Sequence, residues 1–143
     1  MARYVGTVQS NRPADEVFED LADFTSVAQW DPGVASCEHT GGRKGEVGCR
    51  FHVVQDTTGP DIGIDYAITE IEHPRRVVLR GTNAWLVSID VIVVEPTATG
   101  CEVTYDATIK LKGPLALADP LMSLGLKRIG AKAKKGLTDH VNA

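Results

Sequence analysis

Residues 101–112, CEVTYDATIKLK, alternate strictly between apolar and polar side chains. A period of two is typical of a β-strand with one face buried and the other in water. Antiparallel sheets commonly have one covered and one solvated face. The stretch therefore predicts a strand of such a sheet, with an inward set made of Cys101, Val103, Tyr105, Ala107, Ile109 and Leu111.

The segments before this strand extend the same pattern. Strands are predicted near 34–40, 46–57, 61–72, 76–82 and 85–95, separated by short connections rich in Gly and Pro. Connections this short require antiparallel neighbours, because a parallel crossover needs a dozen or more residues. We expect an up-and-down meander in which Arg50, His52, Ser88 and Asp90 face solvent. The expected inward residues are Val47, Cys49, Phe51, Val53, Ile62, Ile64, Tyr66, Ile68, Trp85, Val87, Ile89, Val91 and Val93.

Helices are predicted at two places, after a first strand over 3–10 and at the end of the chain. Pro13 suits the first position of a short helix, and a second short helix ends at Trp30 before Asp31-Pro32-Gly33. The chain then becomes helical after Gly113-Pro114, with a break expected at Asp119-Pro120. One face of the last helix carries an apolar stripe of Met122, Leu126, Ile129, Ala133 and Leu137.

Length and composition predict one domain over 1–143. The chain has 143 residues, 43% apolar and 24% charged, which suits a single hydrophobic core. A long helix laid across an antiparallel sheet is a two-layer α+β architecture.

The apolar runs are far shorter than the roughly 20 residues needed to span a bilayer. The first ten residues lack the apolar stretch of a secretory signal, so we expect a cytoplasmic protein.

Charge and cysteine content narrow the function classes. The net charge of −4 disfavours nucleic-acid binding. This charge is unevenly spread, because residues 1–126 have a net charge of −8 and residues 127–143 have a net charge of +4.

The sequence has no CxxC pair among Cys37, Cys49 and Cys101, which argues against a disulfide framework or a zinc site. Nucleotide-binding and hydrolase motifs are also missing. We expect no metal and no cofactor, because no metal-ligand spacing connects His39, His52, His73 and His140.

Several local motifs resemble one superfamily over nearly the whole chain. They are PADEVFEDL at 13–21 leading to Asp23-Phe24, Trp30-Asp31-Pro32, GEVGCRF at 45–51, the strand start at 100–105, and Gly113-Pro114-Leu115. Together they resemble the START-like (SRPBCC) superfamily, in its bacterial polyketide cyclase/dehydratase and lipid-transport branch. The resemblance implies a helix-grip fold. In that fold a seven-stranded curved antiparallel sheet, with two short helices after the first strand, surrounds a long C-terminal helix and leaves an internal cavity.

Tyr66 and Tyr105 are the main candidate site residues, because a phenol in the apolar phase of a strand needs a hydrogen-bond partner. Ligand contact fits both tyrosines. A catalytic role as proton donor or carbonyl polariser, and a plain core position, remain alternatives. Trp30 fits two roles equally well, a packing anchor in the core and a contact to the ligand. The residues expected to bind a hydrophobic ligand are Trp30, Phe51, Ile64, Tyr66, Trp85, Val87, Ile89, Val103, Tyr105, Met122, Leu126 and Ile129.

Three functions follow from this pattern. The first is non-enzymatic binding of a lipid-like or polycyclic small molecule, for carriage, sequestration or sensing. The second is a polyketide cyclase or dehydratase that uses the pocket tyrosines. The third is a protein-interaction module on the basic face of the last helix, which carries Lys127, Arg128, Lys134 and Lys135 and would also suit transient membrane contact. The sequence favours binding over catalysis, and it leaves the oligomeric state open.

Overall fold

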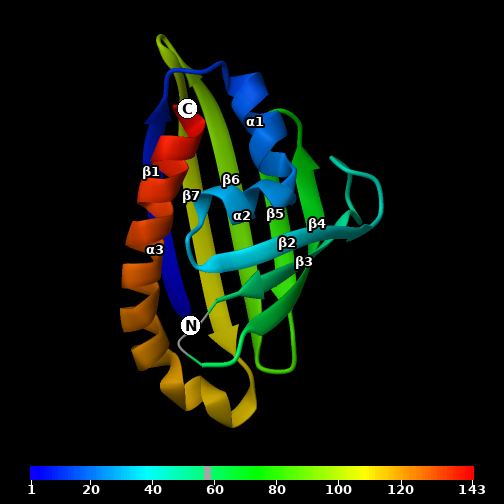
Figure 1. Ribbon diagram of the computed structural model, residues 1–143, viewed down its shortest axis with the longest axis vertical. Helices are drawn as coiled ribbons and strands as arrows, with labels where there is room; N and C mark the ends of the chain where they lie inside the picture. The colour runs from blue at the N-terminus through cyan, green and yellow to red at the C-terminus, as the bar shows by residue number, and fades with distance from the viewer. Residues whose placement is uncertain (57–58) are drawn as a thin grey trace.

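In the computed structural model, which describes residues 1–56 and 59–143, seven β-strands form one antiparallel sheet. The strand order is β1-β7-β6-β5-β4-β3-β2, so β2 to β7 form a meander and β1 joins it beside β7. In Figure 1, β2 runs across the page whereas β6 and β7 run along it, so the sheet is strongly curved. The strands are β1 (Ala2–Ser10), β2 (Val34–Gly41), β3 (Arg50–Gln55), β4 (Ile62–Glu72), β5 (Arg76–Thr82), β6 (Leu86–Thr97) and β7 (Gly100–Leu111).

The helices lie on the concave face of this sheet (Figure 1). Two short helices, α1 (Ala14–Ala22) and α2 (Val27–Trp30), are joined by a 3₁₀ turn, η1 (Phe24–Ser26). A second 3₁₀ segment, η2 (Gly113–Ala118), precedes the long helix α3 (Asp119–Val141) and confirms the break expected there. The predicted helix-grip, seven-stranded α+β fold is therefore correct.

Helix α3 lies very close to its neighbours because two of its three glycines lie where a side chain would not fit. A Cβ on Gly136 would lie 1.8 Å from the carbonyl oxygen of Trp30 in α2. A Cβ on Gly130 would lie 2.4 Å from the ring of Tyr4 in β1. These two glycines let α3 pack against both α2 and the sheet.

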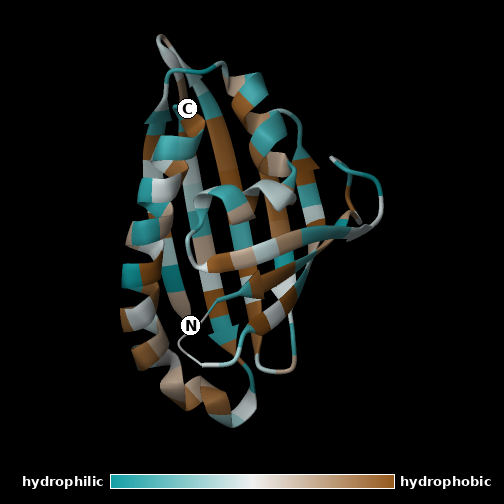
Figure 2. Ribbon diagram, in the orientation of Figure 1, coloured by the Kyte–Doolittle hydropathy of each residue, from teal (hydrophilic) through white to brown (hydrophobic). Residues whose placement is uncertain are grey.

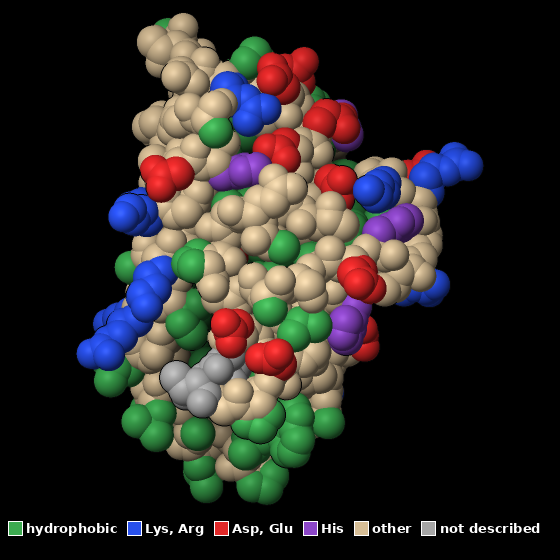
Figure 3. Space-filling view, viewed as in Figure 1, with side chains coloured by type: hydrophobic (Ala, Val, Ile, Leu, Met, Phe, Trp, Pro, Cys, Tyr) green, Lys and Arg blue, Asp and Glu red, His purple; other side chains and the backbone are tan. Residues whose placement is uncertain are grey.

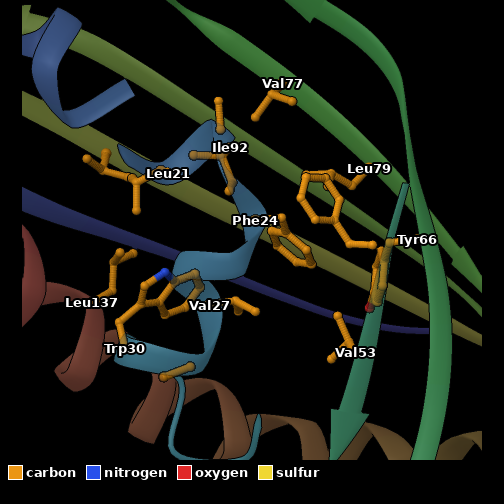
Figure 4. Packing of buried hydrophobic residues seen from close by; sticks show 14 of the residues in the cluster. Leu21, Phe24, Val27, Trp30, Val53, Tyr66, Val77, Leu79, Ile92 and Leu137 are labelled. Atoms are coloured by element: carbon orange, nitrogen blue, oxygen red, sulfur yellow. The ribbon is translucent and has the colours of Figure 1, made fainter. Parts of the chain in front are cut away.

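The core is solid at one end of the layer between the sheet and the helices. There α1, α2 and the C-terminal half of α3 pack their apolar faces onto the strands, as the close view in Figure 4 shows for Leu21, Trp30, Ile92 and Leu137. The largest fully buried side chains include Phe18, Leu21, Phe51, Ile68, Leu79, Ile92, Val94, Val103 and Val141.

One predicted strand begins later than expected. The segment 46–57 was expected to be extended throughout, but β3 begins at Arg50. Gly45 and Gly48 have φ values of +80° and +92°, a backbone conformation typical of glycine in turns. Val47 therefore lies in an exposed turn and not on the inner face. Thr57 falls outside the described residues.

The expected phase of β6 is wrong. Thr97 pairs with Gly100, so a two-residue turn joins β6 to β7, and this register places Asp90 opposite Ala107. Directly paired residues point to the same face of a sheet, so the even-numbered residues of β6 point inward with the odd-numbered residues of β7. Ser88 and Asp90 are therefore buried. The residues expected inward, Trp85, Val87, Ile89, Val91 and Val93, are exposed or only partly buried.

Candidate functional site

A cavity of about 190 Å³ lies between the sheet and the first half of α3. Its wall is mostly apolar, which is typical of small-molecule sites. Ile129 lines the cavity and is 49% exposed, so the cavity reaches the molecular surface beside α3. The lining residues are Tyr4, Phe24, Val27, Asp31, Val34, Val53, Gln55, Ile62, Ile64, Tyr66, Leu86, Ser88, Asp90, Tyr105, Ala107, Ile109, Met122, Leu126, Ile129, Gly130 and Ala133.

The structure brings half of the predicted site residues together on this wall. Strands β4 and β7 contribute the two tyrosines, and α3 contributes three side chains spaced by four and three residues along one face. This set consists of Ile64, Tyr66, Tyr105, Met122, Leu126 and Ile129.

The other predicted site residues lie elsewhere, for two different reasons. Trp30, Phe51 and Val103 are buried in the packed core, but they are not among the residues that line the cavity. Trp85, Val87 and Ile89 belong to the wrongly assigned phase of β6 and lie on the outer side of the sheet, where Trp85 is 58% exposed. Arg50 and His52 face outward as expected, and His52 Nδ1 lies 2.7 Å from Oδ1 of Asp65.

A buried carboxylate on the cavity wall was missed by the sequence reasoning. Asp90 is 3% exposed, and both of its oxygens accept hydrogen bonds. The hydroxyl of Tyr105 donates to Oδ2 at 2.6 Å, and the hydroxyl of Ser88 donates to Oδ1 at 3.0 Å. The length of the turn between β6 and β7 decides the inward phase. The predicted strands, which end at 95 and begin at 101, leave five residues between them, whereas the observed turn has two, at 98–99, and fixes the register of β6 against β7.

Burial changes the acidity of these groups. It raises the pKa of Asp90 to about 6, against the hydrogen bonds from Tyr105 and Ser88, which lower it. Burial and the negative charge of Asp90 raise the pKa of both Tyr66 and Tyr105 well above the ordinary value. Near neutral pH the wall therefore holds an acid that can exchange a proton and two phenols that keep theirs.

A second carboxylate lines the same cavity. Asp31 is 8% exposed and follows α2, where its Oδ1 accepts a hydrogen bond of 2.9 Å from the backbone amide of Gly33. Burial raises the pKa of Asp31, and the backbone hydrogen bond opposes this effect. Its negative charge also adds to the rise in the pKa of Asp90.

Aromatic contacts fix the two tyrosines. The ring of Trp30 meets that of Tyr105 edge to face, with 5.4 Å between centroids. The ring centroids of Phe24 and Tyr66 lie 5.1 Å apart (Figure 4). A Cβ on Gly81 of β5 would lie 2.6 Å from the Tyr66 ring. The absence of a side chain there makes room for that ring against the sheet.

Metal binding finds no support in the part of the chain that the structure describes. No group of three or more His, Cys, Asp or Glu side chains within it is placed to hold an ion. Its three cysteines, Cys37, Cys49 and Cys101, are free, and burial raises the pKa of Cys37 to about 12. A reactive thiolate is therefore not favoured at Cys37.

The sequence profile of the family described as polyketide cyclase / dehydrase and lipid transport matches residues 1–142. The chain belongs to this family. Among curated proteins no sequence matched it. Membership in the polyketide cyclase/dehydrase and lipid transport family agrees with the superfamily resemblance found in the sequence.

Solved structures share the fold of this family member. A START superfamily protein from Mycobacterium smegmatis has a TM-score of 0.81 at 13% identity, with 99% of this chain and 97% of that chain covered. The protein TTHA0849 from Thermus thermophilus has a TM-score of 0.77 at 17% identity, covering 98% and 95%. The di-domain ARO/CYC StfQ from the steffimycin biosynthetic pathway has a TM-score of 0.74 at 14% identity, covering 99% of this chain and 49% of that one.

Proposed function

We propose that this protein binds a compact hydrophobic small molecule in the cavity between the sheet and α3. The observation that carries the proposal is the apolar cavity itself, at the place where a solid core would otherwise continue. Family membership supports it, because the family description names lipid transport and polyketide chemistry. The ligand contacts we propose are Ile64, Tyr66, Tyr105, Met122, Leu126 and Ile129.

The cavity volume limits the size of the ligand. An apolar cavity of about 150 Å³ holds benzene. The present cavity of about 190 Å³ is somewhat larger and reaches the surface, so it suits a molecule of one or two rings whose tail extends outward. Burial of about 300 Å² of ligand surface at about 25 cal/mol per Å² gives about 7 kcal/mol before ordering costs. Binding therefore needs no covalent chemistry.

A neutral two-ring alcohol, naphthalen-2-ylmethanol, tests the proposal by isothermal titration calorimetry. Ala107 is buried on the cavity wall, so Ala107→Leu should fill the space and lower the affinity at least tenfold. The adjacent Thr108 points to the other face of β7, so Thr108→Leu adds the same side chain outside the cavity and should leave the affinity unchanged. Absence of binding to the wild-type protein, or an equal loss in both variants, would overturn the proposal.

A second candidate function, a dehydratase or cyclase, is favoured by Asp90. Its pKa of about 6 suits a general base near neutral pH, whereas both tyrosines hold their protons and do not act as bases there. In a dehydration, the Asp90 carboxylate would take the proton next to a ketone. The β-hydroxyl would then leave as water with that proton, and a conjugated enone would form.

This second function predicts turnover of a β-hydroxyketone with an aryl group, followed by the absorbance of the enone. Asp90→Asn should abolish that turnover and keep ligand affinity, because the amide is similar in shape but is not a base. Tyr66→Phe and Tyr105→Phe should lower it less. Equal rates for the wild-type protein and Asp90→Asn would exclude catalysis by this carboxylate.

The surface near the cavity supports transient membrane contact. We define the apolar end as Trp85, Leu115, Leu117, Leu121 and Leu124, of which Leu117 is 88% exposed and Leu121 is 74% exposed. Figure 3 shows hydrophobic side chains gathered at this end and basic ones farther along α3, and the ribbon in Figure 2 is mostly brown over η2 and the start of α3. The backbone amide of Lys112 donates to Trp85 O at 2.8 Å, which places Trp85 beside η2.

The start of α3 is apolar on two faces. Met122, Leu126 and Ile129 line the cavity, while Leu121 and Leu124 point away from it, and Lys127 and Arg128 follow in the next turn. Leucines next to lysine and arginine suit the interface of an anionic bilayer, where basic groups meet lipid phosphates. Such contact would bring the cavity to a source of hydrophobic ligand. No helix within the described residues is long and apolar enough to cross a membrane.

The three free cysteines agree with a reducing compartment, and we propose the cytoplasm.

A protein partner on the basic face of α3 is the alternative to membrane contact. Capture of the wild-type protein by vesicles that contain phosphatidylglycerol, with no capture by phosphatidylcholine alone, would favour the membrane over such a partner.

A further inference from the structure

The charged side chains on the described part of the cavity wall are all of one sign. Asp31 and Asp90 line the cavity, and no Lys, Arg or His is among the lining residues that the structure describes. Both carboxylates are more than nine-tenths buried. The described wall is therefore mostly apolar, and its charged groups are negative.

The partners of these carboxylates in the described residues do not neutralise them. Among the residues described, Asp90 accepts hydrogen bonds only from the neutral hydroxyls of Ser88 and Tyr105. Asp31 accepts one from the amide of Gly33 through Oδ1, and its Oδ2 has no hydrogen-bond partner among the residues described. By contrast Asp106, on the outer face of β7, is paired with Arg3 at 2.7 Å. Lys132 and Lys135 of α3 share a separate surface pocket with Asp31. Within the described residues neither lysine forms an ion pair with Asp31, and neither lines this cavity.

Buried charge without a counter-charge is costly, and the described part of the cavity wall supplies no cation. A ligand that carries an ammonium group would supply it, through charge-assisted hydrogen bonds to the carboxylates. A carboxylate ligand such as a fatty acid would add a third negative charge in the same low-dielectric space. The raised pKa values of Asp31 and Asp90 are the response expected of acids that lack a cation.

We propose that the ligand of this cavity is a hydrophobic amine and that the cavity rejects hydrophobic carboxylates, with Asp90 and Asp31 as the groups that select it. This inference rests on the proposed binding function, because it specifies the ligand class of the same cavity. The apolar wall holds the ring system and the two carboxylates receive the ammonium group. The selectivity comes from charge, since the rings fit the wall equally well in either ligand.

Three ligands that share one ring system test the inference. Naphthalen-2-ylmethanamine, naphthalen-2-ylmethanol and 2-naphthoate are cationic, neutral and anionic at about pH 7.5. Calorimetric titration of the wild-type protein should show the amine binding at least about tenfold more tightly than the alcohol, and the naphthoate at least about tenfold more weakly. These factors are expected when the amine forms one charge-assisted hydrogen bond and the naphthoate meets one repulsion.

Substitutions that remove each charge separate selectivity from folding. Asp90→Asn and Asp31→Asn should each reduce the preference for the amine over the alcohol while the alcohol still binds, which also reports that the variant is folded. Asp106→Asn is the matched control, because it removes the same charge from the outer face beside Arg3 and should leave the preference intact.

The outcomes distinguish the two proposals. If the alcohol binds but the naphthoate binds as well as the amine, the charge selectivity is wrong and the binding function stands. If neither acid-to-amide variant changes the preference, Asp31 and Asp90 are not the selecting groups. If none of the three ligands binds, the binding function and the selectivity both fail.

Discussion

Tyr105 donates a hydrogen bond of 2.6 Å to the buried carboxylate of Asp90, across two neighbouring strands and on the wall of an apolar cavity. Ser88 donates to the other oxygen of the same carboxylate, so the protein holds this acid in one orientation. A residue of this kind lowers stability when it is ionised, and its position in a cavity is typical of a functional group.

Asp90→Asn should stabilise the protein above about pH 6 and have little effect near pH 4. The pKa of Asp90 is about 6 in the folded protein, against an ordinary value of 3.8, so the folded chain binds this proton more tightly than the unfolded chain. The free energy of unfolding therefore falls as pH rises from about 4 to about 6. The amide does not titrate, so the variant should gain about 3 kcal/mol over the wild-type protein at about pH 8.

Urea unfolding followed by tryptophan fluorescence across this pH range checks the prediction. Asp106→Asn, which breaks an exposed ion pair with Arg3, should change stability by less than about 1 kcal/mol. A difference between wild type and Asp90→Asn that stays constant from acid to neutral pH would contradict the raised pKa of Asp90.

Tyr105→Phe should destabilise the protein more at about pH 8 than at about pH 5. The phenol hydrogen bond stabilises the charged form of Asp90 and lowers its pKa. Loss of a hydrogen bond to a buried carboxylate costs about 2 kcal/mol, and loss of one to a neutral acid about 1 kcal/mol. Chemical denaturation at the two pH values measures both costs. A larger loss at the acidic pH would mean that Tyr105 does not stabilise the ionised acid.

Gly136→Ala should destabilise the protein by about 3 kcal/mol, because the new methyl group would overlap the carbonyl oxygen of Trp30 and force α3 away from α2. Gly125→Ala in the same helix is the control. Its Cβ would meet no atom within 4 Å, so it should gain up to about 1 kcal/mol from helix propensity. Thermal unfolding followed by circular dichroism compares them, and equal effects of the two substitutions would contradict the close contact between α3 and α2.

Leu117→Ser with Leu121→Ser should lower partitioning onto vesicles of phosphatidylcholine and phosphatidylglycerol at least tenfold, because each exposed leucine would contribute about 2 kcal/mol when it inserts. Val47→Ser is the control, since Val47 is exposed in the turn before β3, outside the apolar end. Vesicle sedimentation measures the bound fraction. Equal binding of the double variant and the control would show that the apolar end does not contact lipid.

Most of the fold was predictable because its signals are local. The alternation in 101–112 predicted β7, the short connections predicted antiparallel neighbours, and Asp119-Pro120 predicted the break before α3. The stripe of Met122, Leu126 and Ile129 was predicted in the same way, from helical spacing alone.

The cavity was less predictable because it depends on register and packing. In β6 both phases are largely apolar, so alternation alone did not tell Val87 and Ile89 from Leu86 and Ile92, and Asp90 was assigned to the wrong face. Whether an inward side chain meets the solid core or the empty space depends on the helix that covers it. Phe51 and Val103 belong to the packed core and do not line the cavity. Tyr66 and Tyr105 also pack against the short helical segments, but they line the cavity as well.

The most direct test of ligand binding is a crystal structure of the protein with a brominated naphthalen-2-ylmethanol, located by the anomalous signal of the bromine. The account predicts an anomalous peak inside the cavity, bounded by Tyr66, Tyr105 and Leu126. A peak found only on the apolar end around Leu117 and Leu121, or none at saturating ligand, would contradict it.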